Sequence, residues 1–140
     1  MKYDIIIPCY NSHKTIEKTL ASIVIQKNME DLQVTLVNDA GDNYCNIIDN
    51  FSRLGLDINE ISYSTNGGPA KARNFGRLNT HNEYLMFIDS DDVLSCPWSV
   101  LKLAKVLDNN KYCQLVAGQF MEENSSALHE FFFGPFRLIS

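Results

Sequence analysis

The most distinctive feature of the hydrophobic pattern is a run of apolar and aromatic residues, Tyr84–Ile88, that ends abruptly in polar ones. A continuous apolar run of this length predicts a strand that is buried on both faces of a parallel sheet. The residues that follow it are Asp89, Ser90, Asp91 and Asp92. We therefore expect a buried strand that carries a cluster of carboxylates at its carboxyl end.

Apolar strand-like segments alternate with amphipathic segments along the rest of the chain. Strands are predicted at residues 3–8, 33–37, 58–64, 84–88 and 114–120. Between them, apolar residues at helical spacing predict helices at residues 16–27, 47–54, 70–78 and 97–109. This alternation favours an α/β fold of Rossmann-like type, with a mostly parallel sheet and helices on both faces.

A few residues predict where these helices begin. Asn11 or Ser12 is placed to cap the first helix, and we expect Asp92 to cap the fourth. Pro69 suits the first turn of the third helix, because the N–H that proline lacks has no helical partner at that position.

The polar clusters of the sequence each follow a predicted strand. They are Pro8–Asn11, Asn38–Asp42, Asn66–Gly68 and Asp89–Asp92. In a parallel sheet the carboxyl ends of the strands lie along one edge, where open α/β sheets bind their ligands. We therefore expect these four segments, which are distant in sequence, to form one cleft.

Composition and charge exclude several classes of protein. A chain of 140 residues fits one domain with a single core. The net charge of -5, with no stripe of Lys and Arg, argues against a nucleic-acid partner. The four cysteines lack C-x-x-C spacing, and we expect them to be reduced. With neither a signal-peptide pattern nor a membrane-spanning apolar run, the sequence predicts a cytoplasmic protein.

The acidic cluster is a candidate metal site. Neighbouring carboxylates repel one another, and a cation offsets that cost. Carboxylate oxygens are hard ligands, which favours Mg²⁺ or Mn²⁺ over zinc. The alternative is a solvated acidic turn, but the expected convergence of four polar loops favours the metal site.

These four clusters together resemble the nucleotide-binding half of family 2 glycosyltransferases, which are inverting enzymes with the GT-A fold. The matching segments are Ile-Ile-Ile-Pro-Cys-Tyr-Asn at 5–11, Val-Asn-Asp-Ala-Gly-Asp at 37–42, Asn-Gly-Gly-Pro-Ala-Lys-Ala-Arg-Asn-Phe-Gly at 66–76 and Phe-Ile-Asp-Ser-Asp-Asp at 87–92. The resemblance covers residues 3–120. It implies transfer of a sugar from a nucleotide diphosphate donor, most often a UDP-sugar, to a glycan or lipid-linked acceptor.

The resemblance and the local chemistry suggest how a nucleotide would bind. Asp39 can accept the N–H of a uracil ring, Arg73 can donate to a carbonyl or phosphate, and Tyr10 can stack on the base. Each residue also has a structural alternative: Asp39 as a cap of the following helix, Arg73 as a surface charge and Tyr10 packed on the sheet edge. The matching first motif adds Pro8 and Asn11 to the expected donor-binding residues.

In the D-x-D motif that the chain resembles, Asp91 holds Mg²⁺ or Mn²⁺, while Asp89 and Ser90 approach the ribose. The metal would stabilise the charge that develops on the departing diphosphate. Asn66 and Gly68, with Gly67 between them, would shape the loop beneath the donor, because glycine permits close backbone approach.

The chain departs from the family's pattern in two respects. Where the second motif commonly has two acids followed by Gly-Ser, this chain has Asn38-Asp39-Ala40-Gly41. Inverting transfer also requires a general base, which in the family lies beyond the end of this sequence. The late candidates match no family position, so the catalytic base is unknown; they are Glu122, Glu123, His129 and Glu130.

The resemblance therefore implies a domain truncated at its C-terminus. We expect residues 1–120 to form a nucleotide-sugar-binding domain and residues 121–140 to begin an acceptor-side region. The run Phe131–Phe136 would be core or edge in an intact domain. If it is exposed instead, it would favour homodimerisation or peripheral contact with a membrane surface.

Two other classes have similar architecture. A non-catalytic, receiver-like regulatory domain has a similar length, five strands and an acidic metal site, but it would usually show an acidic pair after the first strand and a lysine after the fifth. A nucleotidyltransferase would normally carry a glycine-rich basic loop after the first strand, which Pro8–His13 does not resemble.

Overall fold

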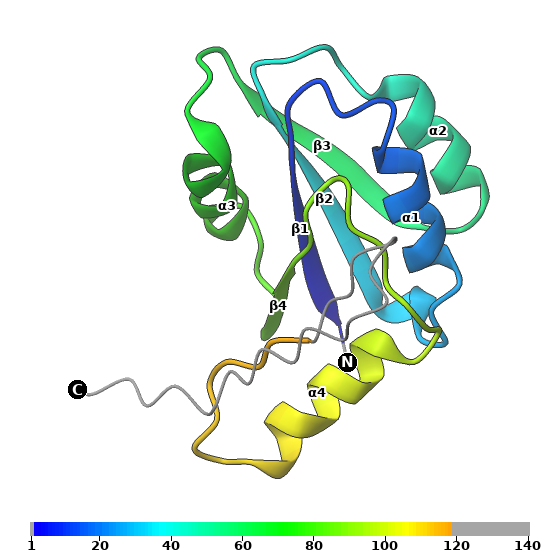
Figure 1. Cartoon of the computed structure of the whole chain (residues 1–140), viewed down its shortest axis with the longest axis vertical. Coiled ribbons are helices and arrows are strands. Elements are labelled where there is room, and N and C mark those ends of the chain that lie inside the picture. Colours follow the sequence, from blue (N-terminus) through cyan, green and yellow to red (C-terminus); the bar gives the residue numbers. More distant parts are fainter. Residues whose placement is uncertain (1, 119–140) are drawn as a thin grey trace, which may run out of the picture. The chain divides into compact units, whose positions relative to one another are not determined.

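The computed structural model describes residues 2–118, which alternate between strands and helices (Figure 1). The strands are β1 Tyr3–Cys9, β2 Leu32–Asp39, β3 Asp57–Tyr63 and β4 Tyr84–Phe87. The helices are α1 Ile16–Val24, α2 Cys45–Arg53, α3 Gly68–Leu78 and α4 Ser99–Asn109, with a short 3-10 helix at Met29–Asp31. The chain divides into two compact units between Ser99 and Val100. All four strands belong to the first unit.

The four strands form one parallel sheet in the order β3-β2-β1-β4. Its register aligns Cys9 with Asn38 and Asp39 with Tyr63, so the carboxyl ends of the three longer strands meet at one edge. This order is that of the doubly wound dinucleotide-binding sheets and differs from the 2-1-3 start of receiver-type sheets. The predicted α/β fold is confirmed, and the strand order argues against the receiver-like alternative.

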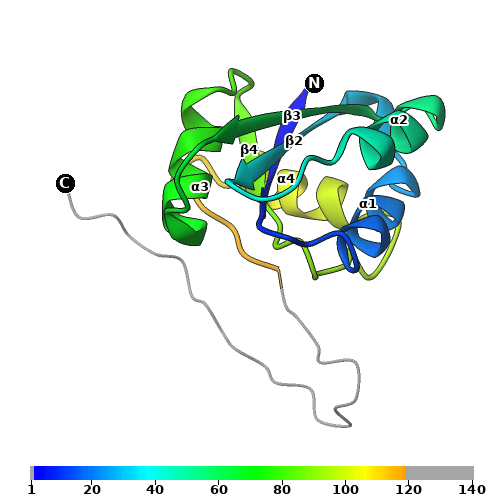
Figure 2. The same cartoon turned by 90° about the horizontal axis from the view of Figure 1, so that it is seen from above.

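Helices cover both faces of this sheet. The steps from β1 to β2 and from β2 to β3 run in one direction across the sheet, whereas the step from β3 to β4 runs back. Right-handed crossovers therefore place α1 and α2 on one face and α3 on the other, as Figure 2 shows from above. None of the helices within residues 2–118 is long and apolar enough to cross a membrane.

Helix α3 lies unusually close to the sheet. Its residue Ala72 packs on Ile6 and Val37, all three of which are fully buried. A β-carbon added at Gly76 would lie 2.6 Å from Cγ2 of Ile6 and 2.9 Å from Cγ2 of Val37, so this position requires glycine. The close packing fixes the start of α3 beside the carboxyl ends of β1 and β2.

The expectation that the strand at Tyr84–Ile88 is buried on both faces is wrong. Within the described residues, β4 pairs only with β1 and is the edge of the sheet. Its side chains alternate between half-buried and exposed, and Leu85 and Phe87 are 36% and 44% exposed. A continuous apolar run shows only that the segment is hydrophobic. It does not show how many strands or helices lie beside it, and for this reason the pattern did not predict the exposure of β4.

The fifth strand predicted at 114–120 is absent from its described part, residues 114–118, which is irregular. Leu115 is 65% exposed there, and without a paired neighbour the backbone gains no ladder of hydrogen bonds. Residues 119 and 120 lie outside the described residues. So do the run Phe131–Phe136, the late base candidates and the whole of the expected region 121–140.

The predicted helix caps are also corrected. Thr15 is the residue before α1, and no side chain caps it. The backbone carbonyl of Ser12 instead accepts the N–H groups of Thr15 and Ile16, both at 3.0 Å. Asp92 lies too far before α4 to cap it, and its N–H closes a turn with the Asp89 carbonyl at 3.1 Å. Pro69 does lie in the first turn of α3, as predicted.

Candidate functional site

A cavity of about 480 Å³ lies at the carboxyl edge of the sheet, within the size range of small-molecule sites. It is lined by Pro8, Cys9, Tyr10, Ser12, Asp39, Asn66, Gly68, Pro69, Ala72, Arg73, Asp89, Ser90 and Asp91. Every expected donor-binding or metal-binding residue except Asn11 is among them. The expected convergence of the four polar segments on one cleft is thus observed in the first compact unit.

Four residues of this lining were not predicted from the sequence: Cys9, Ser12, Pro69 and Ala72. All four lie inside or beside the motifs that were used, so proximity to those motifs was the available signal. What the sequence could not provide is the direction in which each side chain points. Ser12 in particular was one of two candidates, with Asn11, for the cap of α1, and instead it lines the cavity.

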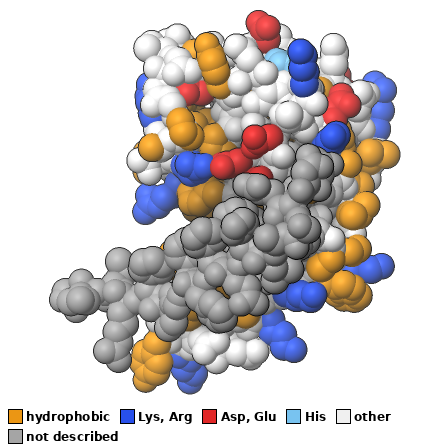
Figure 3. Space-filling model, viewed as in Figure 1, with side chains coloured by type: hydrophobic (Ala, Val, Ile, Leu, Met, Phe, Trp, Pro, Cys, Tyr) orange, Lys and Arg blue, Asp and Glu red, His pale blue; other side chains and the backbone are white. Residues whose placement is uncertain are grey.

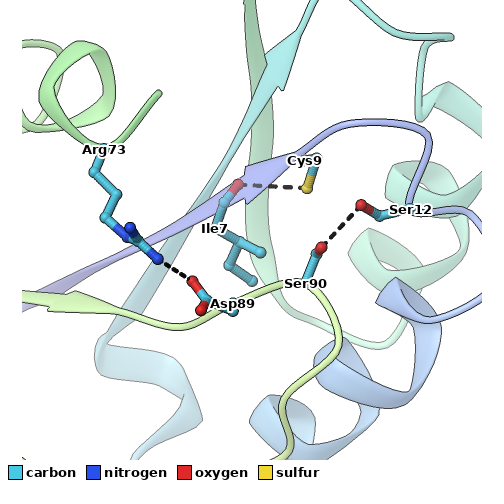
Figure 4. Close-up of polar contacts among 6 residues, drawn as sticks. All are labelled: Ile7, Cys9, Ser12, Arg73, Asp89 and Ser90. Atoms are coloured by element: carbon cyan, nitrogen blue, oxygen red, sulfur yellow. Dashed lines mark hydrogen bonds and ion pairs between the residues drawn. The ribbon is translucent and has the colours of Figure 1, made fainter. Parts of the chain in front are cut away.

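Arg73 and Asp89 face each other across the cavity. Arg73 projects from α3, and its Nη2 forms an ion pair with Oδ1 of Asp89, which follows β4 (Figure 4). Both side chains are partly exposed. Arg73 is therefore neither isolated nor a simple surface charge: it holds Asp89, the first carboxylate of the segment Asp89–Asp92, at the cavity wall. We call this segment the acidic loop.

The acidic loop carries concentrated negative charge. Partial desolvation raises the pKa of Asp92, and the charges of Asp89 and Asp91 raise it further. Acidic side chains gather near the middle of the face seen in Figure 3, beside a basic one. The repulsion expected from three neighbouring acids thus adds to the effect of desolvation on the pKa of Asp92.

The donor set fits a metal that shares its ligands with phosphate and water. Within residues 2–118, no group of three or more His, Cys, Asp or Glu side chains is arranged to hold an ion. Asp89 and Asp91 nevertheless both reach the cavity. Mg²⁺ is commonly bound by one or two carboxylates together with substrate phosphates. The side chains present therefore suit Mg²⁺ or Mn²⁺ with a bound diphosphate, and not a closed all-protein site.

Asp39 caps α3 from the neighbouring strand. Asp39 is only 3% exposed as a residue, and its carboxylate accepts the N–H of Gly67 at Oδ1 and that of Gly68 at Oδ2, both at 2.7 Å. The side chain of Asn66 adds a bond to the Asp39 carbonyl at 3.3 Å. Gly68 has a φ of 80°, a conformation that favours glycine. Asp39 is therefore a helix cap, but of α3 and not of the helix that follows it in sequence.

This arrangement keeps Asp39 ionised. Burial raises the pKa of Asp39, but the N–H groups of Gly67 and Gly68, the nearby Tyr63 hydroxyl and the positive charge of Lys71 outweigh burial, so the pKa lies below its usual value. Burial and the adjacent carboxylate in turn raise the pKa of Tyr63 to about 12. Each carboxylate oxygen of Asp39 has a further lone pair with which to accept another donor.

Asn38 explains the departure in the second motif. Its Nδ2 donates to the carbonyls of Gly41 and Asp42 at 3.2 and 3.0 Å and to Oε1 of Glu60 at 2.7 Å. Its Oδ1 accepts the N–H of Gly41 at 2.8 Å. A carboxylate at this position could accept but not donate. An amide is therefore required to hold the loop between β2 and α2 against Glu60.

Cys9 lies in the cavity wall without nucleophilic character. Its thiol donates to the Ile7 carbonyl at 3.4 Å (Figure 4). Burial and then the charge of Glu60 raise the pKa of this thiol to about 12, against a weaker lowering by Tyr44. Because a thiolate and not a thiol is the nucleophile, Cys9 is a packing residue. All four cysteines, Cys9, Cys45, Cys96 and Cys113, are free thiols in this structure.

Comparisons with known proteins relate this chain to one family. The model of the family described as "Glycosyl transferase family 2" matches residues 4–139. A poly(ribitol-phosphate) beta-N-acetylglucosaminyltransferase, TarS of Staphylococcus aureus, is 32% identical over 98 residues, which are 68% of this chain and 17% of that protein. A poly(ribitol-phosphate) beta-glucosyltransferase of Bacillus spizizenii is 34% identical over 97 residues, 67% of this chain and 15% of that one.

Solved structures show the same relationship. Residues 1–349 of S. aureus TarS in complex with UDP-GlcNAc superpose with a TM-score of 0.68 at 31% identity, covering 78% of this chain and 32% of that one. A mannosyltransferase of Pyrobaculum calidifontis, solved with GDP-Man and Mn²⁺, gives a TM-score of 0.72 at 20% identity, covering 80% and 33%; at that identity the likeness shows the fold alone. This chain spans less than a fifth of the two relatives matched by sequence.

Proposed function

The chain belongs to glycosyltransferase family 2 and has the GT-A type of α/β fold, and on that premise we propose that it binds a UDP-sugar with Mg²⁺ or Mn²⁺. The sugar would pass, with inversion, to a hydroxyl of a glycan or lipid-linked acceptor. The observation that carries the proposal is the meeting of Tyr10, Asp39, Arg73 and the acidic loop in one cavity.

The choice of a uridine donor is supported by the relatives. TarS is 32% identical to this chain in the sequence comparison and 30–31% identical in the structural comparison. Its structure has been solved with UDP-GlcNAc and with UDP. Asp39 offers an ionised acceptor in the cavity wall, where a uracil N–H would meet it. Tyr10 is 54% exposed, which leaves its ring available to stack on a base.

The diphosphate requires positive charge, and Arg73 supplies it. The N-terminal amides of α3 are less suited to this task, because those of Gly67 and Gly68 already donate to Asp39. The Arg73 guanidinium has five N–H donors, so it can bind a phosphate while it keeps its bond to Asp89. The loop of Asn66, Gly67 and Gly68 would form the floor under the donor.

Asp91 would hold the metal ion, while Asp89 and Ser90 face the ribose. When bound, the ion supplies stabilisation of the negative charge on the departing diphosphate. Arg73 adds to that stabilisation and fixes Asp89 at the cavity wall. Pro8 contributes apolar surface to the same wall. Asn11 does not line the cavity, so its part in donor binding is indirect.

Transfer also needs a base for the acceptor hydroxyl. We leave the catalytic base unassigned, since Glu122, Glu123, His129 and Glu130 lie outside the described residues. Residues 1–120 are proposed as the donor-binding part and 121–140 as the beginning of the acceptor side. Cysteines without disulfides suit the proposed cytoplasmic location.

Calorimetric titration with UDP and GDP in the presence of Mn²⁺ tests the donor assignment. The cavity is expected to bind UDP and to prefer it over GDP, because a purine is larger than the uracil ring for which Tyr10 and Asp39 are the proposed contacts. Equal binding of both nucleotides would reduce the site to a diphosphate-binding one. Absence of binding by the folded chain would overturn the proposal.

A further inference from the structure

We infer that Ser12 is a positioning residue for the donor site: its hydroxyl joins the loop that carries Tyr10 to the loop that carries Asp89 and Asp91. The inference rests on the proposed function and deepens it. Ser12 is not part of any motif by which the family was recognised, and it was expected only to cap α1.

The hydrogen bonds of this hydroxyl form a consistent set. Ser90 Oγ donates to Ser12 Oγ at 2.8 Å (Figure 4). Ser12 Oγ donates its own hydrogen to the Tyr10 carbonyl and accepts the Tyr10 N–H, both at 3.3 Å. A serine hydroxyl has one donor and two acceptor positions, so these three bonds use its full capacity. One side chain thus connects the residue proposed to stack on the base with the middle of the acidic loop.

The backbone of Ser12 is held in place by the buried residue Tyr44. Its N–H donates to the Tyr44 hydroxyl at 2.9 Å, and Tyr44 is 1% exposed. The ring of His13 stacks on Tyr44 with centroids 4.3 Å apart and an interplanar angle of 5°. Asn11, just before Ser12, has a φ of 51°, a left-handed conformation that asparagine adopts more readily than most residues. The backbone turn at Asn11 and the contact with Tyr44 together fix the position of Ser12.

Ser90 lies between the two carboxylates that the proposed metal and ribose contacts require. A bond at Ser90 restrains the backbone on either side, and so limits the orientations of Asp89 and Asp91. Arg73 restrains Asp89 from the opposite wall, whereas Ser12 contacts the loop from the β1 side. With both restraints in place, nucleotide binding would require less ordering of the loop, which increases affinity.

The test is a double-mutant cycle in UDP binding, measured by calorimetry with Mn²⁺ on the 140-residue chain. Ser12→Ala and Ser90→Ala are each expected to weaken UDP binding about threefold to tenfold, the range expected for one neutral hydrogen bond. The double variant should bind UDP less weakly than the product of the two single effects predicts, because both single variants remove the same Ser12–Ser90 hydrogen bond. Ser12→Thr, which keeps the hydroxyl, should restore most of the affinity.

Two readouts, the UDP affinity and the thermal midpoint of unfolding, separate a positioning role from an effect on general stability. Ser52→Ala, on the exposed side of α2, is the matched control and should leave both unchanged. A Ser12→Ala chain that binds UDP as well as the original, or singles whose effects multiply in the double variant, would overturn the inference and leave the proposed function standing. Failure of the unmodified folded chain to bind UDP would overturn the proposed function and this inference with it.

Discussion

The carboxylate of Asp39, at the end of β2, accepts the N–H of Gly68 at 2.7 Å although 29 residues separate them in sequence. A residue proposed to bind the nucleotide base therefore also fixes the start of the helix that carries Arg73. The proposed base contact and the proposed phosphate contact are thus linked through one carboxylate.

Replacement of Asp39 by asparagine tests this linkage through pH. Because the pKa of Asp39 is lowered in the folded chain, its carboxylate stabilises the fold at every pH above its unfolded value, near 4, and loses that effect as pH falls through the folded pKa. Asp39→Asn should reduce the free energy of unfolding by about 1–3 kcal/mol at pH 7. Denaturant titrations at several pH values should show the deficit shrinking below pH about 4.

Asn38→Asp would restore the acid that the family commonly has at this position, and we expect it to be destabilising here. The new carboxylate would face Glu60 and the carbonyls of Gly41 and Asp42 without a hydrogen to donate. The loss should be about 1–3 kcal/mol at pH 7. The repulsion raises the pKa of the new acid in the folded chain. The loss of unfolding free energy should therefore appear once the pH exceeds the pKa that this acid has in the unfolded chain, and it should increase until the pH reaches the pKa in the folded chain. A variant as stable as the original at pH 7 would contradict the proposed role of Asn38.

Arg73→Gln tests the phosphate contact. Loss of a charged hydrogen bond to the diphosphate should weaken UDP binding about 10- to 100-fold. Thermal stability should change little, because exposed ion pairs contribute at most about 1 kcal/mol. Arg77→Gln, an exposed position on the same helix, is the control and should bind UDP normally. Equal losses in both variants would indicate a general charge effect instead of a specific contact.

Much of this architecture was predictable from the sequence. The periodicity of apolar residues located all four strands of the sheet, and the motifs at their carboxyl ends contained nine predicted residues among the thirteen that line the cavity. Such predictions succeed because burial on a parallel sheet and exposure at its carboxyl edge are recorded in local sequence.

Relationships between distant residues were not predictable. Aspartate is a residue type that commonly caps helices, and the local sequence suggested that Asp39 would cap α2, the helix that follows it. The parallel pairing of β2 with β3 instead places Asp39 beside the start of α3. The hydroxyl of Ser12 bonds to the backbone of Tyr10, two residues away, and also to the distant Ser90, and local sequence does not reveal the second partner. The exposure of Phe87 likewise depends on which strands are neighbours.

The most direct test of the proposed donor site is calorimetric titration with UDP of the original chain and of Asp91→Asn, with Mn²⁺ and again after chelation. We predict that Mn²⁺ strengthens UDP binding by the original chain and that Asp91→Asn loses this gain. Asp57→Asn, exposed at the opposite end of the sheet, should keep it. Two results would contradict the proposed metal-assisted donor site: a UDP affinity of the original chain that is the same with and without Mn²⁺, or an Asp91→Asn chain whose UDP affinity increases with Mn²⁺ as much as that of the original.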